Sequence, residues 1–311
     1  MLWAPAGAGD PLLAPLAVHN LNPFAQVQGL PAWSAPLAER GGGFALSADL
    51  ASHFTRSRRG DEAVSLDGET LRAALRWERQ AGERWRIGAE LPWLVHGGGV
   101  LDGFIEGWHE FFGLPSLGRD RVPRGRLRLT YRRAGRTRVD IRSARNGPGD
   151  LGLYAVHRID RHALAVRLKL PTGEAGDLLG SGAPALSAWW RGRWPLPRGA
   201  LHAGAGGAWL GQGGVLPGRQ RHRAAFGGVA AAWRVRPRLA LKLQLDAHTA
   251  LYRSALRELG DAVLQISAGG SIALGRGWYL DLAVVEDELR YDASPDVTFH
   301  LALRRIPVDR Y

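Results

Sequence analysis

The chain has 311 residues, of which 45% are hydrophobic, and a formal net charge of +12. No apolar run approaches the length of about 18 residues that a transmembrane helix needs, and the absence of cysteine excludes disulfides and cysteine metal sites. Lys169 and Lys242 are the only lysines, so nearly all of the 41 basic residues are arginine, and they are spread along the chain. A nucleic-acid-binding protein usually gathers its basic residues into a patch or tail, so we expect no nucleic-acid partner.

The amino-terminal part shows no strand period. The first ten residues lack the basic and apolar regions of a signal peptide, so we expect a signal peptide that is incomplete or missing in this sequence. Residues 11–42 are rich in Pro, Ala and Gly, and an Asn-Pro pair favours a turn. We predict that residues 1–42 form either a periplasmic tail or a plug of the lumen of a β-barrel that the later residues form. The plug or turn residues are Asn20, Asn22, Pro23 and Phe24.

From residue 43 onward, apolar and polar residues alternate. Every second residue from Leu239 to Ala247 is aliphatic, and the residues between include Lys242 and Asp246. Successive side chains of a strand point to opposite faces, so this pattern predicts a β-strand with one apolar and one polar face. The same alternation recurs in thirteen further segments: 44–51, 71–78, 85–93, 126–132, 139–142, 150–159, 164–170, 186–194, 201–209, 225–233, 262–272, 278–285 and 297–304.

Long and short connections alternate between these strands. The long connections are 56–68, 96–125, 143–149, 172–185, 211–220, 252–260 and 287–295. Bacterial outer-membrane barrels have an even number of strands, short periplasmic turns and long outer loops. We therefore predict an all-β protein in which residues 43–311 form a single antiparallel transmembrane β-barrel. The count is about 14 strands, or about 12 if the hairpin at 126–142 is only an excursion of a loop.

The connection 96–125 breaks the strand pattern. Its apolar residues, among them Leu101, Phe104 and Trp108, recur at three- and four-residue steps, which predicts a short amphipathic helix. Asp102, Glu106 and His109 include side chains that can bind a cation, but a solvated helix face is the commoner role for such residues. We expect no metal site and no cofactor.

The polar faces of the strands define the predicted lumen. If their arginines pair with acidic residues across strands, the lumen is closed and structural, whereas an open lumen would attract anions. A barrel of this width needs either water or a plug inside. The charged residues predicted to face the lumen and to line a substrate path are Arg72, Arg76, Arg84, Arg86, Arg128, Arg138, Arg167, Lys169, Arg191, Arg193, Lys242 and Asp246.

Several local motifs carry a family resemblance. The segments Gly149–Leu153, Leu168–Gly173 and Gly180–Gly182, together with Asn20–Phe24 and the predicted helix Asp102–Gly113, resemble an uncharacterised family of proteobacterial outer-membrane β-barrel proteins. The central pattern is also similar to outer-membrane proteins linked to phenol meta-pathway degradation, which are considered transporters of hydrophobic compounds. The resemblance implies a barrel in the outer membrane of a Gram-negative bacterium, and it supplies no catalytic residues.

Three functions stay open at this point. The first is a porin-like channel or transporter for small hydrophobic or anionic compounds, and the second is a structural or surface-binding barrel without flux, in which the long loops bind. The third is an outer-membrane lipid hydrolase, but no motif joins its candidates His248, His300, Ser267 and Ser271 into a nucleophile and base, so we expect no enzyme. Expected partners are outer-membrane lipids and lipopolysaccharide, the barrel-assembly machinery during insertion, and an unidentified small molecule.

Overall fold

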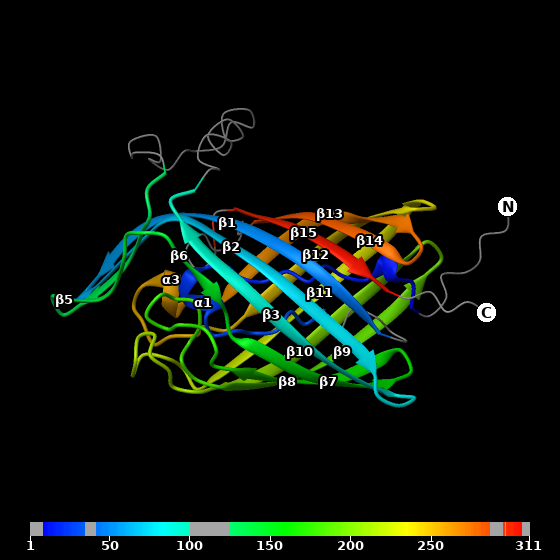
Figure 1. The fold of residues 1–311 in the computed structure, drawn as a ribbon, viewed down its shortest axis with the longest axis horizontal. Helices are drawn as coiled ribbons and strands as arrows, with labels where there is room; N and C mark the ends of the chain where they lie inside the picture. The colour runs from blue at the N-terminus through cyan, green and yellow to red at the C-terminus, as the bar shows by residue number, and fades with distance from the viewer. Residues whose placement is uncertain (1–8, 35–41, 100–124, 287–294, 296, 307–311) are drawn as a thin grey trace.

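A computed structural model describes residues 9–34, 42–99, 125–286, 295 and 297–306 of the chain. Within these residues, twelve antiparallel strands close into a barrel (Figure 1). The strands of the barrel are β1 (Gly43–Arg59), β2 (Glu62–Gln80), β3 (Trp85–Gly97), β7 (Leu151–Ile159), β8 (His162–Leu170), β9 (Ala185–Leu196), β10 (Gly199–Leu210), β11 (Arg223–Arg236), β12 (Leu239–His248), β13 (Val263–Gly275), β14 (Trp278–Glu286) and β15 (Val297–Arg305).

The barrel closes where its first and last strands meet. β1 pairs with β15 over nine residues, from Phe44 opposite Arg305 to Ser52 opposite Val297. Every other barrel strand pairs with its neighbours in the barrel, including β3 with β7 across the longest connection. Closure removes the free strand edges that an open sheet would expose. The single antiparallel barrel is thereby confirmed.

Three further strands lie outside the closed barrel: β4 (Arg128–Arg133), β5 (Arg136–Ile141) and β6 (Arg145–Pro148). β4 pairs with the first residues of β2, β5 pairs with β4, and β6 pairs with the last residues of β3. The segments predicted at 126–132 and 139–142 are therefore strands, but they belong to an excursion of a loop. The count of twelve that this alternative gave is confirmed, and the count of fourteen is not.

The connection predicted at 56–68 is a strand hairpin instead of a loop. β1 and β2 continue past the barrel and turn at Gly60, whose φ of +58° suits glycine. The sequence here has weak alternation, so it resembles a loop. The backbone of Glu62–Asp67 is nevertheless paired on both sides, with β1 and with β4. Those pairings satisfy backbone groups that a loop would leave to water.

The apolar faces of the strands point outward. Leu241 and Leu243 of β12 are 54% and 53% exposed, whereas Lys242 and Gln244 between them are 5% and 1% exposed. A soluble β-sandwich would bury its leucines and expose its lysine, so this arrangement is that of a wall between lipid and an interior. Trp77, Trp93 and Trp209 are also exposed on this outer surface.

The described helices are short: η1 (Pro11–Leu13), α1 (Pro23–Gln26) and α3 (Arg257–Gly260). The amphipathic helix predicted within 96–125 lies outside the described residues. None of the helices in the described ranges has the length and apolarity to span a membrane.

Candidate functional site

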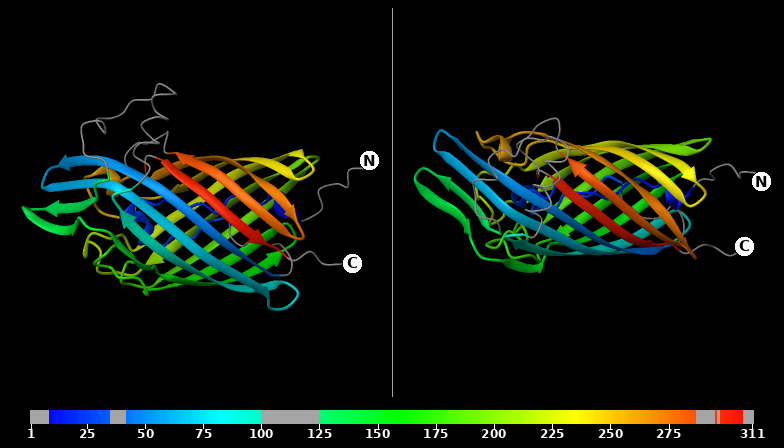
Figure 2. Two further views of the ribbon diagram at one scale, coloured as in Figure 1. Left: turned by 45° about the horizontal axis from the view of Figure 1, so that its top comes forward. Right: turned by 90° about the horizontal axis from the view of Figure 1, so that it is seen from above.

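The amino-terminal residues 9–34 lie inside the barrel as a U, which we call the inner hairpin (Figures 1 and 2). Near the short-turn end of the barrel, His202 Nε2 donates to the Leu13 carbonyl at 2.9 Å. Halfway along, the side chain of Gln244 bonds both the N–H and the carbonyl of Leu16, at 2.9 and 3.1 Å. At the loop end, Tyr252 Oη donates to the Phe24 carbonyl at 2.8 Å. Side chains of the surrounding barrel thus satisfy backbone N–H and carbonyl groups of the inner hairpin that no sheet satisfies.

The Asn-Pro sequence forms the tip of the inner hairpin. The side chain of Asn22 accepts from the Phe24 N–H at 3.0 Å and caps α1, in which Pro23 occupies the first turn. Asn20 Oδ1 accepts from the Asn22 N–H at 2.9 Å. The Phe24 ring packs edge-on against Tyr131 and is fully buried. These local bonds explain why this sequence bends here, because Asn side chains replace backbone partners in a tight turn.

The returning arm of the inner hairpin is held by Trp33, a residue that the sequence did not single out. Its Nε1 donates to Asp246 Oδ1 at 2.6 Å, and its carbonyl accepts from Trp189 Nε1 at 3.1 Å. The indole lies on Gly204 and Gly228, where an added Cβ would come within 2.6 and 2.3 Å of it. These two glycines are paired across β10 and β11. Glycine in a strand often marks a place where another group approaches the backbone closely. Glycines at inward positions of neighbouring strands were therefore the one signal in the sequence for the packing of Trp33 against the wall.

Three of the predicted lumen arginines converge on one carboxylate, Glu90. Arg72 Nη2 lies 2.5 Å from Glu90 Oε1, Arg76 Nε lies 2.8 Å from Oε2, and Arg167 Nη2 lies 3.7 Å from Oε1. Arg72 also lies 3.7 Å from Asp49, whose other oxygen is 2.5 Å from His300 Nδ1. All of these residues are buried. A buried cation needs such a partner, because its loss of hydration is not otherwise offset.

The two lysines are paired as well. Lys242 lies 3.6 Å from Asp281, which also accepts from Arg304 Nε at 2.6 Å. Lys169 contacts the carboxylate of Asp150 and donates to the Val27 carbonyl of the inner hairpin at 3.4 Å. Lys169 and Lys242 are therefore paired with acidic residues, as Arg72, Arg76 and Arg167 are, whereas Asp246 contacts Trp33 and Gln244.

The other predicted lumen residues fall into two groups. Arg86 and Arg193 are buried on barrel strands, while Arg191 donates to the Ser34 carbonyl at 3.0 Å. Arg84, Arg128 and Arg138 do not line the barrel. Arg84 is exposed in the turn before β3, and the other two lie on β4 and β5, outside the closed barrel. Their alternation is that of any strand with one polar face, so the sequence could not separate them from lumen residues.

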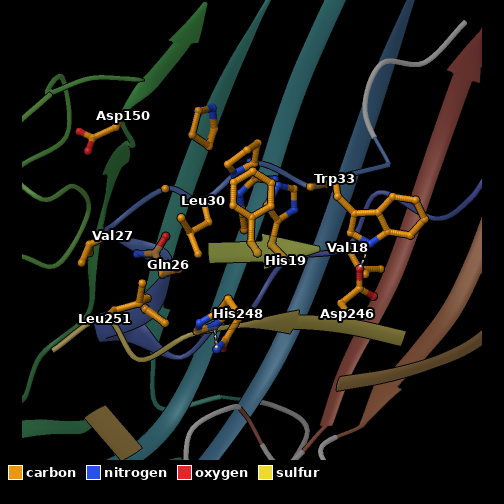
Figure 3. A pocket seen from close by; sticks show the side chains of 18 of the residues that line it. Val18, His19, Gln26, Val27, Leu30, Trp33, Asp150, Asp246, His248 and Leu251 are labelled. Atoms are coloured by element: carbon orange, nitrogen blue, oxygen red, sulfur yellow. Dashed lines mark hydrogen bonds between the residues drawn. The ribbon is translucent and has the colours of Figure 1, made fainter. Parts of the chain in front are cut away.

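A cavity of about 80 Å³ lies between the inner hairpin and the wall (Figure 3). Its lining is mixed, with Arg72, Glu90 and Arg167 on one side and Trp33, Asp246 and His248 elsewhere. His248 Nε2 is 3.0 Å from the Asn20 amide. Apolar side chains complete the lining: Val18, Leu30, Leu94, Phe226 and Leu251.

The loop end of the interior is tied together by Glu62, which sits on the part of β2 beyond the barrel. Its carboxylate accepts from Tyr131 Oη at 2.6 Å, Arg219 Nη2 at 2.7 Å, Ser254 Oγ at 2.9 Å and the Ala255 N–H at 2.7 Å. Burial by itself raises the pKa of Glu62, but these hydrogen bonds and the charge of Arg219 outweigh it and hold the pKa below its ordinary value. One carboxylate thus joins three separate connections.

Three of the four hydrolase candidates contact other groups. His300 bonds Asp49, and Ser271 Oγ donates to Asp281. His248 contacts Asn20 and the Thr249 carbonyl, the latter at 2.9 Å. A nucleophile needs a base within hydrogen-bond reach, and these contacts use His300 and Ser271 to hold carboxylates.

Comparisons with known proteins agree with this architecture. The family model described as "Protein of unknown function (DUF3187)" matches residues 7–305. No curated protein is similar enough in sequence to count as a match. The COG4313 outer membrane channel from Pseudomonas putida F1 is 14% identical, with 85% of this chain and 95% of that chain covered and a TM-score of 0.56. This likeness shows a shared outer-membrane barrel fold. The P. putida toluene transporter TodX is also 14% identical, over 92% and 91% of the two chains, with a TM-score of 0.40.

Proposed function

The chain belongs to the DUF3187 family, whose function is unknown, and we propose from its geometry that it is an outer-membrane channel for small hydrophobic compounds. The observation that supports this is the cavity between the inner hairpin and the barrel wall. Val18, Leu30 and Phe226 line it with apolar side chains beside a few polar groups, which is the composition of small-molecule sites.

The charges beside the cavity favour a neutral solute. Arg72 and Arg167 line it, but so does Glu90, their common partner. A charged solute would have to break these contacts and lose its own hydration in a buried space. An apolar solute needs neither, and it gains from leaving water. We therefore favour hydrophobic over anionic compounds as the substrate class.

We also propose that the inner hairpin closes the channel and must shift for a solute to pass. Its tip is attached to the loop end by single hydrogen bonds, such as Gln28 Nε2 to Tyr252 Oη at 2.8 Å and Gln26 Nε2 to the Leu178 carbonyl at 2.8 Å. Its returning arm is attached by Trp33. Loosening one attachment should open a path along the wall.

Conductance in planar bilayers tests the closure. We expect few steps from the folded full-length protein and frequent steps from a variant lacking residues 9–34. Because that deletion can impair folding, Trp33→Ala is measured beside it, with the heat-dependent gel shift of folded barrels as the check. If both variants fold and stay silent, the hairpin is not the closure and a structural barrel without flux becomes the better account.

Uptake of two solutes of similar size tests the substrate class. Cells carrying the protein in the outer membrane are given radiolabelled benzyl alcohol or benzoate, and cells with the empty vector give the background. We expect the protein to speed entry of the neutral compound by several-fold and to leave that of the anion unchanged. Faster entry of benzoate alone would overturn the proposal in favour of an anion channel.

A further inference from the structure

Beyond the barrel, the extended ends of β1 and β2 and the hairpin β4–β5 form a four-stranded sheet, which we call the outer ribbon (Figures 1 and 2). It comprises residues 54–67 and 128–141 and is rich in arginine. Its exposed arginines are Arg56, Arg58, Arg59, Arg132, Arg136 and Arg138. The exposed acidic residues of the ribbon are fewer, Asp61 and Asp140, so an excess of positive charge remains, which points to an anionic partner.

Part of this charge has no partner among the residues that the structure describes. Arg56 lies 3.6 Å from Asp67, and Arg59 donates to the Ala255 carbonyl at 3.4 Å. Among the residues that the structure describes, Arg58, Arg132, Arg136 and Arg138 make no ion pair or side-chain hydrogen bond. They contrast with the interior arginines Arg72 and Arg76, which meet a carboxylate.

The strand register places two of these arginines on one face. Arg58 of β1 is opposite Ala63 of β2, and Ala63 is opposite Arg132 of β4. Directly opposed residues share a face, and neighbouring strands are about 4.8 Å apart, so the two arginine Cα atoms are separated by about 10 Å. Only the methyl group of Ala63 lies between them. Two guanidinium groups in this arrangement can close on a single anion with paired hydrogen bonds.

The other face of the outer ribbon is already covered. Val64, Leu66, Leu129 and Tyr131 are buried, and Tyr131 packs on Phe24 of the inner hairpin. The apolar face therefore closes over the barrel interior, and the arginine face points away from the barrel axis. A partner must approach from the surroundings of the barrel.

The outward face of β1, followed from the short-turn end toward the outer ribbon, indicates what surrounds the ribbon. Leu46, on the membrane part of the strand, is 51% exposed to lipid. Further along the same face come Phe54 and then Arg56, whose Cζ lies 6.0 Å from the Phe54 ring centre. Aliphatic, aromatic and charged side chains follow in the order of hydrocarbon, interface and headgroups. The long-connection end of such barrels faces the cell exterior, so the arginines lie at the level of the outer-leaflet headgroups.

We propose that the outer ribbon binds the phosphate groups of lipopolysaccharide in the outer leaflet through Arg58 and Arg132. Arg136 and Arg138 extend the positive field at the edge of the ribbon, where they draw the anionic headgroups toward this face. This binding surface rests on the placement in the outer membrane, and it does not depend on the proposed channel activity.

Binding of purified lipopolysaccharide to the full-length protein in detergent tests the proposal. The variant Arg58→Gln/Arg132→Gln is compared with Arg79→Gln/Arg84→Gln, which removes the same charge from exposed positions at the short-turn end. We expect the ribbon variant to bind at least tenfold more weakly and the control to bind as the unchanged protein does. The gel shift of the folded barrel and the conductance should be the same in both.

Two further ligands identify the anion. Lipopolysaccharide whose phosphates have been removed should bind no better to the unchanged protein than to the ribbon variant. Vesicles of phosphatidylglycerol and free inorganic phosphate should compete poorly. Equal losses in the two variants, full binding of the dephosphorylated form, or equal binding of phosphatidylglycerol would each overturn the proposal.

Discussion

The barrel interior and the outer ribbon use the same side chain in opposite ways. Arg72 and Arg76 inside the barrel are buried and share the carboxylate of Glu90. Arg58 and Arg132 on the ribbon are exposed and flank Ala63. The difference follows from hydration, because a guanidinium removed from water requires a carboxylate, whereas one in water does not. An arginine on the polar face of a strand therefore has no fixed role until its surroundings are known.

Removing Glu90 should give the largest effect. Glu90→Gln leaves three buried arginines without their common carboxylate, and loss of one partner from a buried pair costs about 3–5 kcal/mol. We expect the midpoint of urea unfolding in detergent to fall accordingly. Glu83→Gln, in the exposed turn before β3, is the control and should leave the midpoint in place. Equal midpoints for the two variants would mean that the interior pairing is not what stabilises the barrel.

Crowding the position where Trp33 packs against the wall should give the second largest effect. Gly228→Ala places a Cβ 2.3 Å from Trp33 Nε1 and 2.2 Å from the Leu245 carbonyl oxygen, whereas the nearest atom at Gly207 is 3.7 Å away. Overpacking costs about 1–3 kcal/mol, so Gly228→Ala should lower the unfolding midpoint and raise the frequency of conductance steps. Gly207→Ala should change neither. A stable, silent Gly228→Ala protein would contradict the attachment of the hairpin at this point.

The Glu62 contacts at the loop end should respond to pH. The pKa of Glu62 in the folded protein is below its ordinary value of 4.5, so the charged form is the one that folding favours. Its stabilisation is complete well above that value and is lost as the pH falls through the lower folded pKa. The hydrogen-exchange protection factors of residues 249–256, which correct for the intrinsic effect of pH on exchange, should therefore fall on acidification, and in Glu62→Gln they should already be low at pH 7. Unchanged protection in Glu62→Gln would show that other contacts hold these loops.

The smallest effect is expected at the edge of the ribbon. Asp140 and Arg142 form an ion pair at 2.7 Å, but both side chains are well exposed. Exposed pairs contribute little to stability, so Asp140→Asn should leave the unfolding midpoint unchanged within error. A marked loss of stability would mean that water does not screen the charges of the outer ribbon.

The strand alternation in the sequence was sufficient to predict the barrel and its outward apolar faces. Leucines at every second position of 239–245 require one lipid-facing side, because lipid is the only solvent that favours so many exposed leucines. The same pattern could not distinguish barrel strands from the hairpin β4–β5. Both alternate, and only the pairing of β3 with β7 shows which segments close the barrel.

The candidate site depended on tertiary structure for a different reason. Trp33 and Asp246 are 213 positions apart, and Glu62 meets Ser254 across 192 positions. Periodicity reports the face on which a side chain lies, and it carries no information about which distant side chain will face it. The sequence by itself determined the alternating segments, their polar and apolar sides and the bend at Asn22. Closure of the barrel around the inner hairpin decided the charge partners and the cavity, because only then are the buried arginines removed from water.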